Sequence, residues 1–267
     1  MLEQIVLNNF FLFNDYQHFN LKRINLLTGL NNTGKTNFLK SILLIRQSLP
    51  SLFKNNELTL NSKIIKFGTF NEISNNRELF IKIKYDDLIH TFKSLSIKNS
   101  IEEQKWEKVK IDRLHYYQDV PEISDSELVK LLDTLKYIRY DHNNWNSAMA
   151  LILASLRAKP NDIIISEHPG ERFHPYCQSK LIEALFTKKK NDVQWFIETH
   201  NNTILNAFRI LVKRQHIDSD DLNILHFPHK NSASPITVKV DSDGRIEDWP
   251  EYFFDQEDKD YEELFGL

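Results

Sequence analysis

The chain is poor in cysteine and has no long apolar run, and each shortage excludes a class of protein. A single cysteine, Cys177, cannot close an internal disulfide, which excludes a disulfide-stapled scaffold and fits a reducing compartment. No apolar run approaches the roughly 20 residues that a membrane helix needs. The first residues also lack the basic and apolar regions of a signal peptide. We therefore expect a cytoplasmic protein that does not contact a membrane.

An excess of positive charge is also missing. Lys and Arg total 34 against 37 Asp and Glu, so the formal net charge is -3. This balance argues against the uniformly basic surface of a dedicated nucleic-acid binder, although it leaves room for a local basic groove. The densest basic run, residues 188–190, is typical of a solvated helix end. At 267 residues, the chain suits one large α/β domain or two lobes.

Strand-like and helix-like patterns alternate along the chain. Strands are expected at residues 4–13, 24–28, 79–85, 163–165, 193–197, 223–227 and 236–240, and helices at 37–49, 124–137, 147–157, 175–188 and 203–213. This alternation predicts a mostly parallel sheet with right-handed crossovers. The acidic stretch 251–263 contains several aromatic residues, and we expect it to pack against the domain.

Glycine is scarce, with six in the whole chain, yet two of them belong to one phosphate-binding motif. The motif G-x-x-x-x-G-K-[ST] is complete in Gly29, Leu30, Asn31, Asn32, Thr33, Gly34, Lys35 and Thr36, and Asn37 follows it. Such a loop turns backbone N–H groups toward phosphate, the lysine reaches the β and γ oxygens, and the threonine hydroxyl binds Mg²⁺. A strand before the loop and a helix after it argue against a chance match. The sequence therefore predicts that the chain binds ATP with Mg²⁺.

An acidic residue at the tip of a neighbouring strand is the second requirement of such a site. The apolar run 163–165 ends in Ser166 and Glu167, and P-loop enzymes use an acid at this place to hold Mg²⁺ or its water. We therefore assign Glu167 to the metal, together with Thr36. The alternative is an ordinary solvated carboxylate at a strand end.

Three segments resemble the RecF, SMC and OLD branch of ABC ATPases: residues 29–31, 167–175 and 196–200. The resemblance implies an α/β P-loop NTPase fold, an ABC ATPase head with a mixed sheet and an inserted helical segment. It also implies that His200 is the switch residue that contacts the γ-phosphate. The lobes are expected at 1–95 for the P-loop, at 96–157 for the helical segment with a degenerate signature loop, and at 158–267 for the second lobe.

The region 244–256 is similar to small bacterial ATPases, many of them found in anti-phage defence loci. It contains a glycine, a Trp-Pro pair and a Phe-Phe-Asp-Gln element. This resemblance implies an ATP-dependent switch that acts as a head-to-head homodimer or higher oligomer. Its partner would be a separate effector such as a nuclease or toxin, because the roughly 40 residues after the last core strand are too few for a catalytic domain. A DNA-repair or DNA-binding head and a non-hydrolysing, ATP-bound scaffold are the alternatives.

The sequence departs from the family pattern at two places. His168 stands where a glutamate usually polarises the attacking water, so the base is His168, or Glu171 further along the turn, or hydrolysis is slow. The signature loop has lost its glycines and corresponds to residues 144–147, where Asn146 and Ser147 could still donate to a phosphate.

A zinc site is an alternative interpretation of the histidines. His174, His226 and His229 could join Glu167, but their spacing is not typical of zinc ligands, so this reading is disfavoured. His174 is better explained as part of the turn that opens the next helix.

Overall fold

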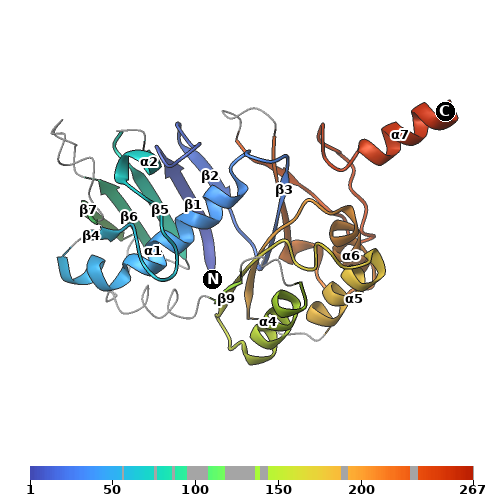
Figure 1. Ribbon diagram of the computed structural model, residues 1–267, viewed down its shortest axis with the longest axis horizontal. Coiled ribbons are helices and arrows are strands. Elements are labelled where there is room, and N and C mark those ends of the chain that lie inside the picture. Colours follow the sequence, from blue (N-terminus) through green and yellow to red (C-terminus); the bar gives the residue numbers. More distant parts are fainter. Residues whose placement is uncertain are drawn as a thin grey trace. The chain divides into compact units, whose positions relative to one another are not determined.

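The computed structural model describes residues 1–55, 57–74, 77–85, 88–94, 108–117, 136–138, 144–187, 192–228 and 234–266. Its contacts divide the chain into two compact units, coloured along the sequence in Figure 1. Unit 1 contains Met1–Leu21 and Thr36–Leu135, and unit 2 contains Lys22–Lys35 and Lys136–Leu267. The phosphate loop and the strand before it therefore group with the C-terminal half of the chain. The sequence had assigned them to a lobe at 1–95.

Unit 1 is built on an antiparallel sheet with the strand order β2-β1-β5-β6-β7-β4. The strands are β1 (Leu2–Asn8), β2 (Gln17–Asn20), β4 (Glu57–Thr59), β5 (Phe80–Tyr85), β6 (Leu88–Ser94) and β7 (Lys108–Tyr117). The helices are α1 (Lys35–Asn55) and α2 (Phe70–Ser74). The first residue of α1, Lys35, still groups with unit 2, and the rest of the helix belongs to unit 1. The prediction of a mostly parallel sheet is wrong for this unit, because β5, β6 and β7 pair in chain order with no described helix between them.

Two strands also correct the helical segment expected at 96–157. β7 lies within it and pairs with β6 from Ser94 to Leu88. Residues 136–138, which overlap the end of a predicted helix at 124–137, form β8 (Lys136–Ile138) beside β9 (Ile163–Glu167). Residues 118–135 of that segment lie outside the described part of the chain. Both segments form strands because they pair with a neighbouring strand, and the local sequence pattern does not contain this information.

Unit 2 contains the sheet that the sequence predicts, with the order β12-β11-β3-β10-β9-β8. Its other strands are β3 (Ile24–Gly29), β10 (Gln194–Glu198), β11 (Leu222–Phe227) and β12 (Ile236–Val238). All are parallel except β12, which pairs antiparallel with β11, so the sheet is mixed. Because parallel strands end at the same edge, the ends of β3, β9 and β10 lie together.

Three helices gather beside this sheet, α4 (Asn144–Arg157), α5 (Pro175–Phe186) and α6 (Asn202–Lys213) (Figure 1). The buried residues of α6 recur every three or four positions, so one face of the helix is apolar. In the core the Phe186 ring contacts the rings of Trp195 and Phe208, at 4.9 and 5.0 Å between centroids. Burying each such side chain contributes about 1.5–3 kcal/mol.

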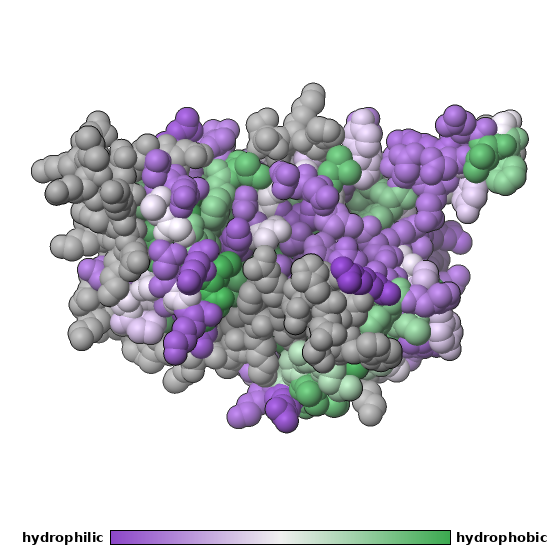
Figure 2. Space-filling model, viewed as in Figure 1, coloured by the Kyte–Doolittle hydropathy of each residue, from purple (hydrophilic) through white to green (hydrophobic). Residues whose placement is uncertain are grey.

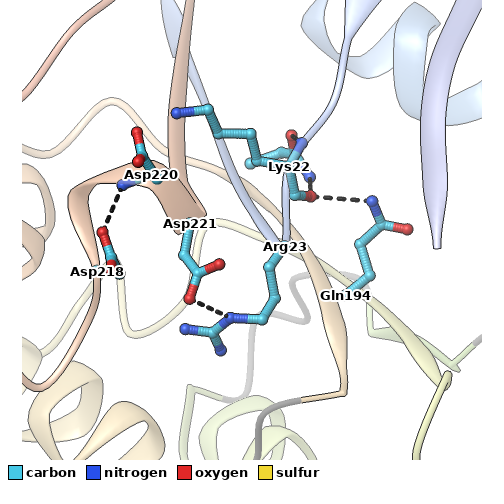
Figure 3. Close-up of polar contacts among 7 residues, drawn as sticks. Lys22, Arg23, Gln194, Asp218, Asp220 and Asp221 are labelled. Atoms are coloured by element: carbon cyan, nitrogen blue, oxygen red, sulfur yellow. Dashed lines mark hydrogen bonds and ion pairs between the residues drawn. The ribbon is translucent and has the colours of Figure 1, made fainter.

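Polar contacts join the opposite ends of these strands (Figure 3). Arg23 Nε donates to Asp221 Oδ2 at 2.9 Å, in the short 3₁₀ helix η2 (Ser219–Asp221) that precedes β11. Gln194 Nε2, at the start of β10, donates to the Lys22 carbonyl at 2.9 Å. These contacts hold β3 against both neighbours, so that the other ends of the three strands stay aligned.

The last helix, α7 (Gln256–Phe265), is exposed along its described residues. Leu264 and Phe265 are 73% and 69% exposed, and the apolar end of the helix is visible in Figure 2. The expectation that the whole stretch 251–263 packs against the domain is therefore wrong for this helix. Among the described residues, no helix combines the length and the apolar character that a bilayer crossing requires.

Candidate nucleotide site

The phosphate loop connects β3 to α1, and glycine is required where the loop leaves the sheet. Gly29 has φ +125°, and a Cβ atom built on it would lie 2.2 Å from the Phe227 carbonyl oxygen of the paired strand β11. Gly34 has φ +111°, and Asn32 takes the left-handed backbone, with φ +60°. Inside the loop, Thr33 Oγ1 donates to the Leu30 carbonyl at 2.8 Å. The loop therefore has the compact, left-handed turns that a phosphate cradle needs.

Lys35 closes this loop. Its ammonium donates to the carbonyls of Gly29 at 3.0 Å and Leu30 at 2.5 Å, and the residue is only 3% exposed. Burial lowers the pKa of Lys35 to about 8, and the nearby charge of Glu198 opposes this shift. A buried cation that binds carbonyls of its own loop can exchange those partners for the oxygens of an anionic ligand.

Two buried carboxylates stand side by side at the strand ends. Glu167 ends β9 and Glu198 ends β10, and they are register partners in the parallel pair. They are 8% and 3% exposed. On the other side of β10, Glu198 pairs with Leu27 of β3, two residues before Gly29. The sequence had identified Glu167, but it had given Glu198 no role. Its position at the end of an apolar strand next to β9 is the signal that could have found it.

A pair of imidazoles adjoins these carboxylates. His168 follows β9 with φ +48°, and its ring stacks on that of His200 at 5.0 Å between centroids and 18° between planes. His168 Nε2 lies 3.9 Å from Glu198 Oε1. Desolvation lowers the pKa of His168, and it lowers the pKa of His200 to about 4, with Lys35 contributing to both shifts. Both rings are therefore neutral near pH 7.

Side-chain amides hold the two turns that contain these histidines. Gln178 of α5 donates to the carbonyls of Gly170 at 3.0 Å and Glu171 at 3.2 Å. Its oxygen accepts from Asn201 Nδ2 at 2.8 Å, and Asn201 Oδ1 caps α6 through the Thr203 N–H. One glutamine thus links the turn after β9 to the turn after β10.

A pocket of about 420 Å³ opens over this pair of turns. It is lined by His168, Pro169, Glu171, Thr199, His200, Asn201, Asn202, Thr203, Phe254, Gln256 and Glu257. The predicted base candidates His168 and Glu171 and the predicted switch residue His200 thus share one cavity.

A second pocket, of about 260 Å³, lies between the phosphate loop and a C-terminal turn. Gly29, Leu30 and His200 line one side, and residues 252–256 line the other. Phe253 is buried in that turn, with its ring 5.2 Å from His226 and 5.2 Å from Trp249. Sequence reasoning had not assigned this turn to the site, since no local pattern indicates which loop a distant turn covers.

The remaining predicted site residues fall into three groups. Asn31 and Asn32 are exposed on the loop. Thr36 and Asn37 begin the part of α1 that belongs to unit 1, so the position of these two residues relative to Glu167 stays a prediction. Asn146 and Ser147 lie in the first turn of α4, and their side chains are outside the described part.

Among the described residues, neither His174 nor His226 belongs to a group of metal-ligating side chains. His174 caps α5 by accepting from the Tyr176 N–H at 3.3 Å, as expected for a helix-opening turn. His226 Nδ1 lies 3.5 Å from Thr28 Oγ1 inside the sheet, and His229 lies outside the described residues.

These residues fit a magnesium-bound triphosphate. The loop has a glycine where a side chain would clash with β11, and a buried ammonium beside its carbonyls. Carboxylate oxygens lie at the ends of β9 and β10. Hard oxygen donors are those that Mg²⁺ prefers.

The lowered pKa of Lys35 predicts how binding depends on pH. Below about pH 8 the ammonium is charged and the affinity for ATP is expected to be flat. Above that value, binding must first protonate Lys35, so the affinity should fall by up to about tenfold per pH unit. Calorimetric titration across this range checks the prediction. Lys35→Arg stays charged and should show no such fall, whereas a wild-type affinity that holds through pH 9 would contradict it.

Comparisons with known proteins give a family-model match in the C-terminal region and a fold for the chain. Residues 217–264 match a family described as "Protein of unknown function (DUF3696)". The match includes β11, β12, the turn at 252–256 and most of α7. No curated protein matches the chain.

Several solved structures are similar to the chain over most of its length. An SMC head domain from Thermotoga maritima has a TM-score of 0.52 at 12% identity and covers 90% of this chain and 99% of its own. An SmcHead bound to the C-winged helix domain of ScpA has a TM-score of 0.54 at 9% identity and covers 89% and 98%. An Smc head domain with an extended coiled coil, bound to the C-terminal domain of ScpA derived from Pyrococcus furiosus, has a TM-score of 0.51 at 8% identity and covers 99% of each chain. The predicted fold class is thus confirmed: the chain has the α/β fold of a P-loop ATPase head of the ABC class, with a mixed sheet.

Proposed function

We propose that this chain binds ATP with Mg²⁺ and hydrolyses it. The observation that carries this proposal is the buried Lys35 ammonium, which sits on the Gly29 and Leu30 carbonyls of a glycine-turned loop and feels the charge of Glu198. A buried cation held this way has a strong preference for an anion of matching shape. The sequence motif and the fold support the same ligand.

Each residue has a separate task in the proposed reaction. The loop N–H groups and the start of α1 bind the phosphates, and Lys35 moves from the loop carbonyls to the β and γ oxygens. Thr36 and Glu167 would hold Mg²⁺, which neutralises phosphate charge. His200 contacts the γ-phosphate as a neutral donor. His168, whose pKa is lowered, accepts the proton of the attacking water, and Glu171 across the same pocket is the second candidate.

The cellular role that we propose is a nucleotide-dependent switch in a bacterial anti-phage defence complex. Two heads would meet across ATP, with Asn146 and Ser147 at the helix start facing the partner's phosphate, and the γ-phosphate would bias a separate effector such as a nuclease or toxin. The resemblance of residues 244–256 to small defence ATPases supports this role. The exposed apolar end of α7 supports a protein partner, and the cytoplasm is the proposed location.

A DNA-binding head is the second candidate. Its support is that the similar solved structures are SMC heads, two of them bound to parts of ScpA. DNA binding would appear as an affinity that falls steeply with salt, because phosphate contacts release counterions. A non-hydrolysing scaffold is the third candidate, and it would bind ATP without turnover.

Calorimetry on folded, nucleotide-stripped protein tests the first step. We expect uptake of ATP with Mg²⁺ and much weaker uptake of AMP, which lacks the β and γ phosphates that Lys35 contacts. Phosphate release in the same buffer then separates an ATPase from a scaffold. Absence of ATP uptake by folded protein would overturn the proposal.

A further inference from the structure

His168, Glu198 and His200 form a compact set of metal-ligating side chains. Each offers one ligand atom, and these atoms lie within 4.8 Å of one another, in the one such group among the residues that the structure describes. The two rings stack, and His168 Nε2 is 3.9 Å from Glu198 Oε1. In the proposed ATPase reaction Glu198 has no task.

The chemistry of this set suits a borderline transition metal. Two imidazoles with one carboxylate are the ligands of many catalytic zinc sites, which keep a position open for water. Imidazole nitrogen also favours Zn²⁺, Co²⁺ and Cu²⁺ over Mg²⁺. A metal–ligand bond is about 2.0–2.2 Å, so atoms 3.9 Å apart already lie near the separation that a shared ion imposes.

The surroundings provide charge, access and rigidity. Glu198 is buried at the end of β10, while His168 and His200 line the 420 Å³ pocket, through which an ion and its water could enter. His168 and His200 each offer one ring nitrogen as a ligand atom. The opposing charge is Lys35, whose ammonium is attracted to Glu198, whereas Glu167 and Glu171 face His168 with negative charge.

We propose that His168, Glu198 and His200 bind a transition-metal ion of the Zn²⁺ type, and that this ion inhibits ATP hydrolysis at the nucleotide site. The ion would occupy the lone pair with which His168 accepts a proton, and it would constrain the ring of His200 that contacts the γ-phosphate. The Lys35 ammonium and the metal ion are both attracted to the Glu198 carboxylate. When ATP phosphates draw Lys35 away from Glu198, the affinity of the site for the metal should rise. Only the inhibition rests on the proposed ATPase function, because the ion binds without nucleotide.

Titration of this nucleotide-free chain with Co²⁺ tests the site. All proteins carry Cys177→Ser, which removes the exposed thiol as a competing ligand. We expect one Co²⁺ per chain with a visible absorption band that Zn²⁺ displaces. Glu198→Gln and His200→Asn should each weaken binding at least about tenfold, the lower end of the loss caused by altering even the supporting residues of a metal site. His18→Asn, at an exposed position in β2, is the matched control.

If a variant does not fold, a measurement on the protein with all three ligands unaltered tests the site. Pulsed electron paramagnetic resonance of Cu²⁺ bound to the same protein counts coordinated imidazoles, and we expect two. Fewer than two, no Co²⁺ band, or Co²⁺ binding unchanged in folded Glu198→Gln and His200→Asn would overturn the site. ATP turnover that stays at the level of the metal-free protein while Zn²⁺ fills the site would overturn the inhibition alone. Failure of the Co²⁺-free protein to take up ATP with Mg²⁺, while a separate titration still shows Co²⁺ binding, would instead overturn the proposed function and leave the site.

Discussion

Lys35→Ala is expected to lower the ATP turnover number by about 10²–10³-fold, which is the usual loss when one group that stabilises charge in the transition state is removed. The physical reason is that Lys35 is the buried cation of the loop, 3% exposed and bonded to the Gly29 and Leu30 carbonyls. Without it, the developing charge on the γ-phosphate loses a positive partner. Steady-state phosphate release at saturating ATP measures the effect, and calorimetry measures the accompanying loss of affinity.

Lys213→Ala is the matched control for this substitution. Lys213 is exposed in the last turn of α6, so the same change of side chain removes a solvated charge and should leave turnover within about twofold, as expected for a surface charge. If Lys35→Ala kept wild-type turnover, the activity would come from another site or from a contaminant. Lys35→Ala should also fold at least as well as the parent, because it removes a charge whose burial is unfavourable.

Gly29→Ala is expected to reduce the free energy of unfolding by about 3 kcal/mol or more, since it combines backbone strain with a clash. The new Cβ would lie 2.2 Å from the Phe227 carbonyl oxygen, and the residue would have to keep φ +125°, a region that L side chains rarely adopt. Neither problem can be relieved without separating β3 from β11, where Gly29 and Phe227 are register partners. Urea denaturation measures the loss. ATP affinity should fall with it, because the loop begins at this residue.

Gly266→Ala separates the clash from the backbone preference. Gly266 also has a positive φ, +64°, as the C-cap of α7, but no atom lies within 4 Å of an added Cβ. We expect a cost of about 1 kcal/mol or less, limited to the end of an exposed helix, and unchanged ATP affinity. Equal costs for the two substitutions would mean that β11 does not constrain the phosphate loop.

The local patterns of the chain were sufficient for the elements that carry the phosphate site. The apolar runs before Gly29 and Glu167 predict β3 and β9, because short apolar runs are typical of strands buried in a parallel sheet. The periodic apolar residues of α6 fix a helix with one buried face. His174 was correctly placed in the turn that opens a helix, and the structure shows that it caps α5 through a neighbour two residues away.

The same reasoning failed where pairing with distant residues decides the outcome. Residues 108–117 form a strand because β6 offers them a free edge, and residues 136–138 do so because β9 does. The exposure of α7 was also missed, because aromatic residues in an acidic stretch do not reveal whether a surface exists for them to cover.

The sequence by itself determined that a phosphate-loop motif, an acidic strand end and the segment 196–200 with His200 occur, because each is encoded within a few consecutive residues. Only the tertiary structure decided which of these groups meet. The order β3-β10-β9 makes Glu198 the neighbour of Glu167, stacks His168 on His200, and leaves the turn at 252–256 facing Gly29. Strand order is set by how whole elements bury their apolar faces against one another, and no short stretch of sequence contains that information.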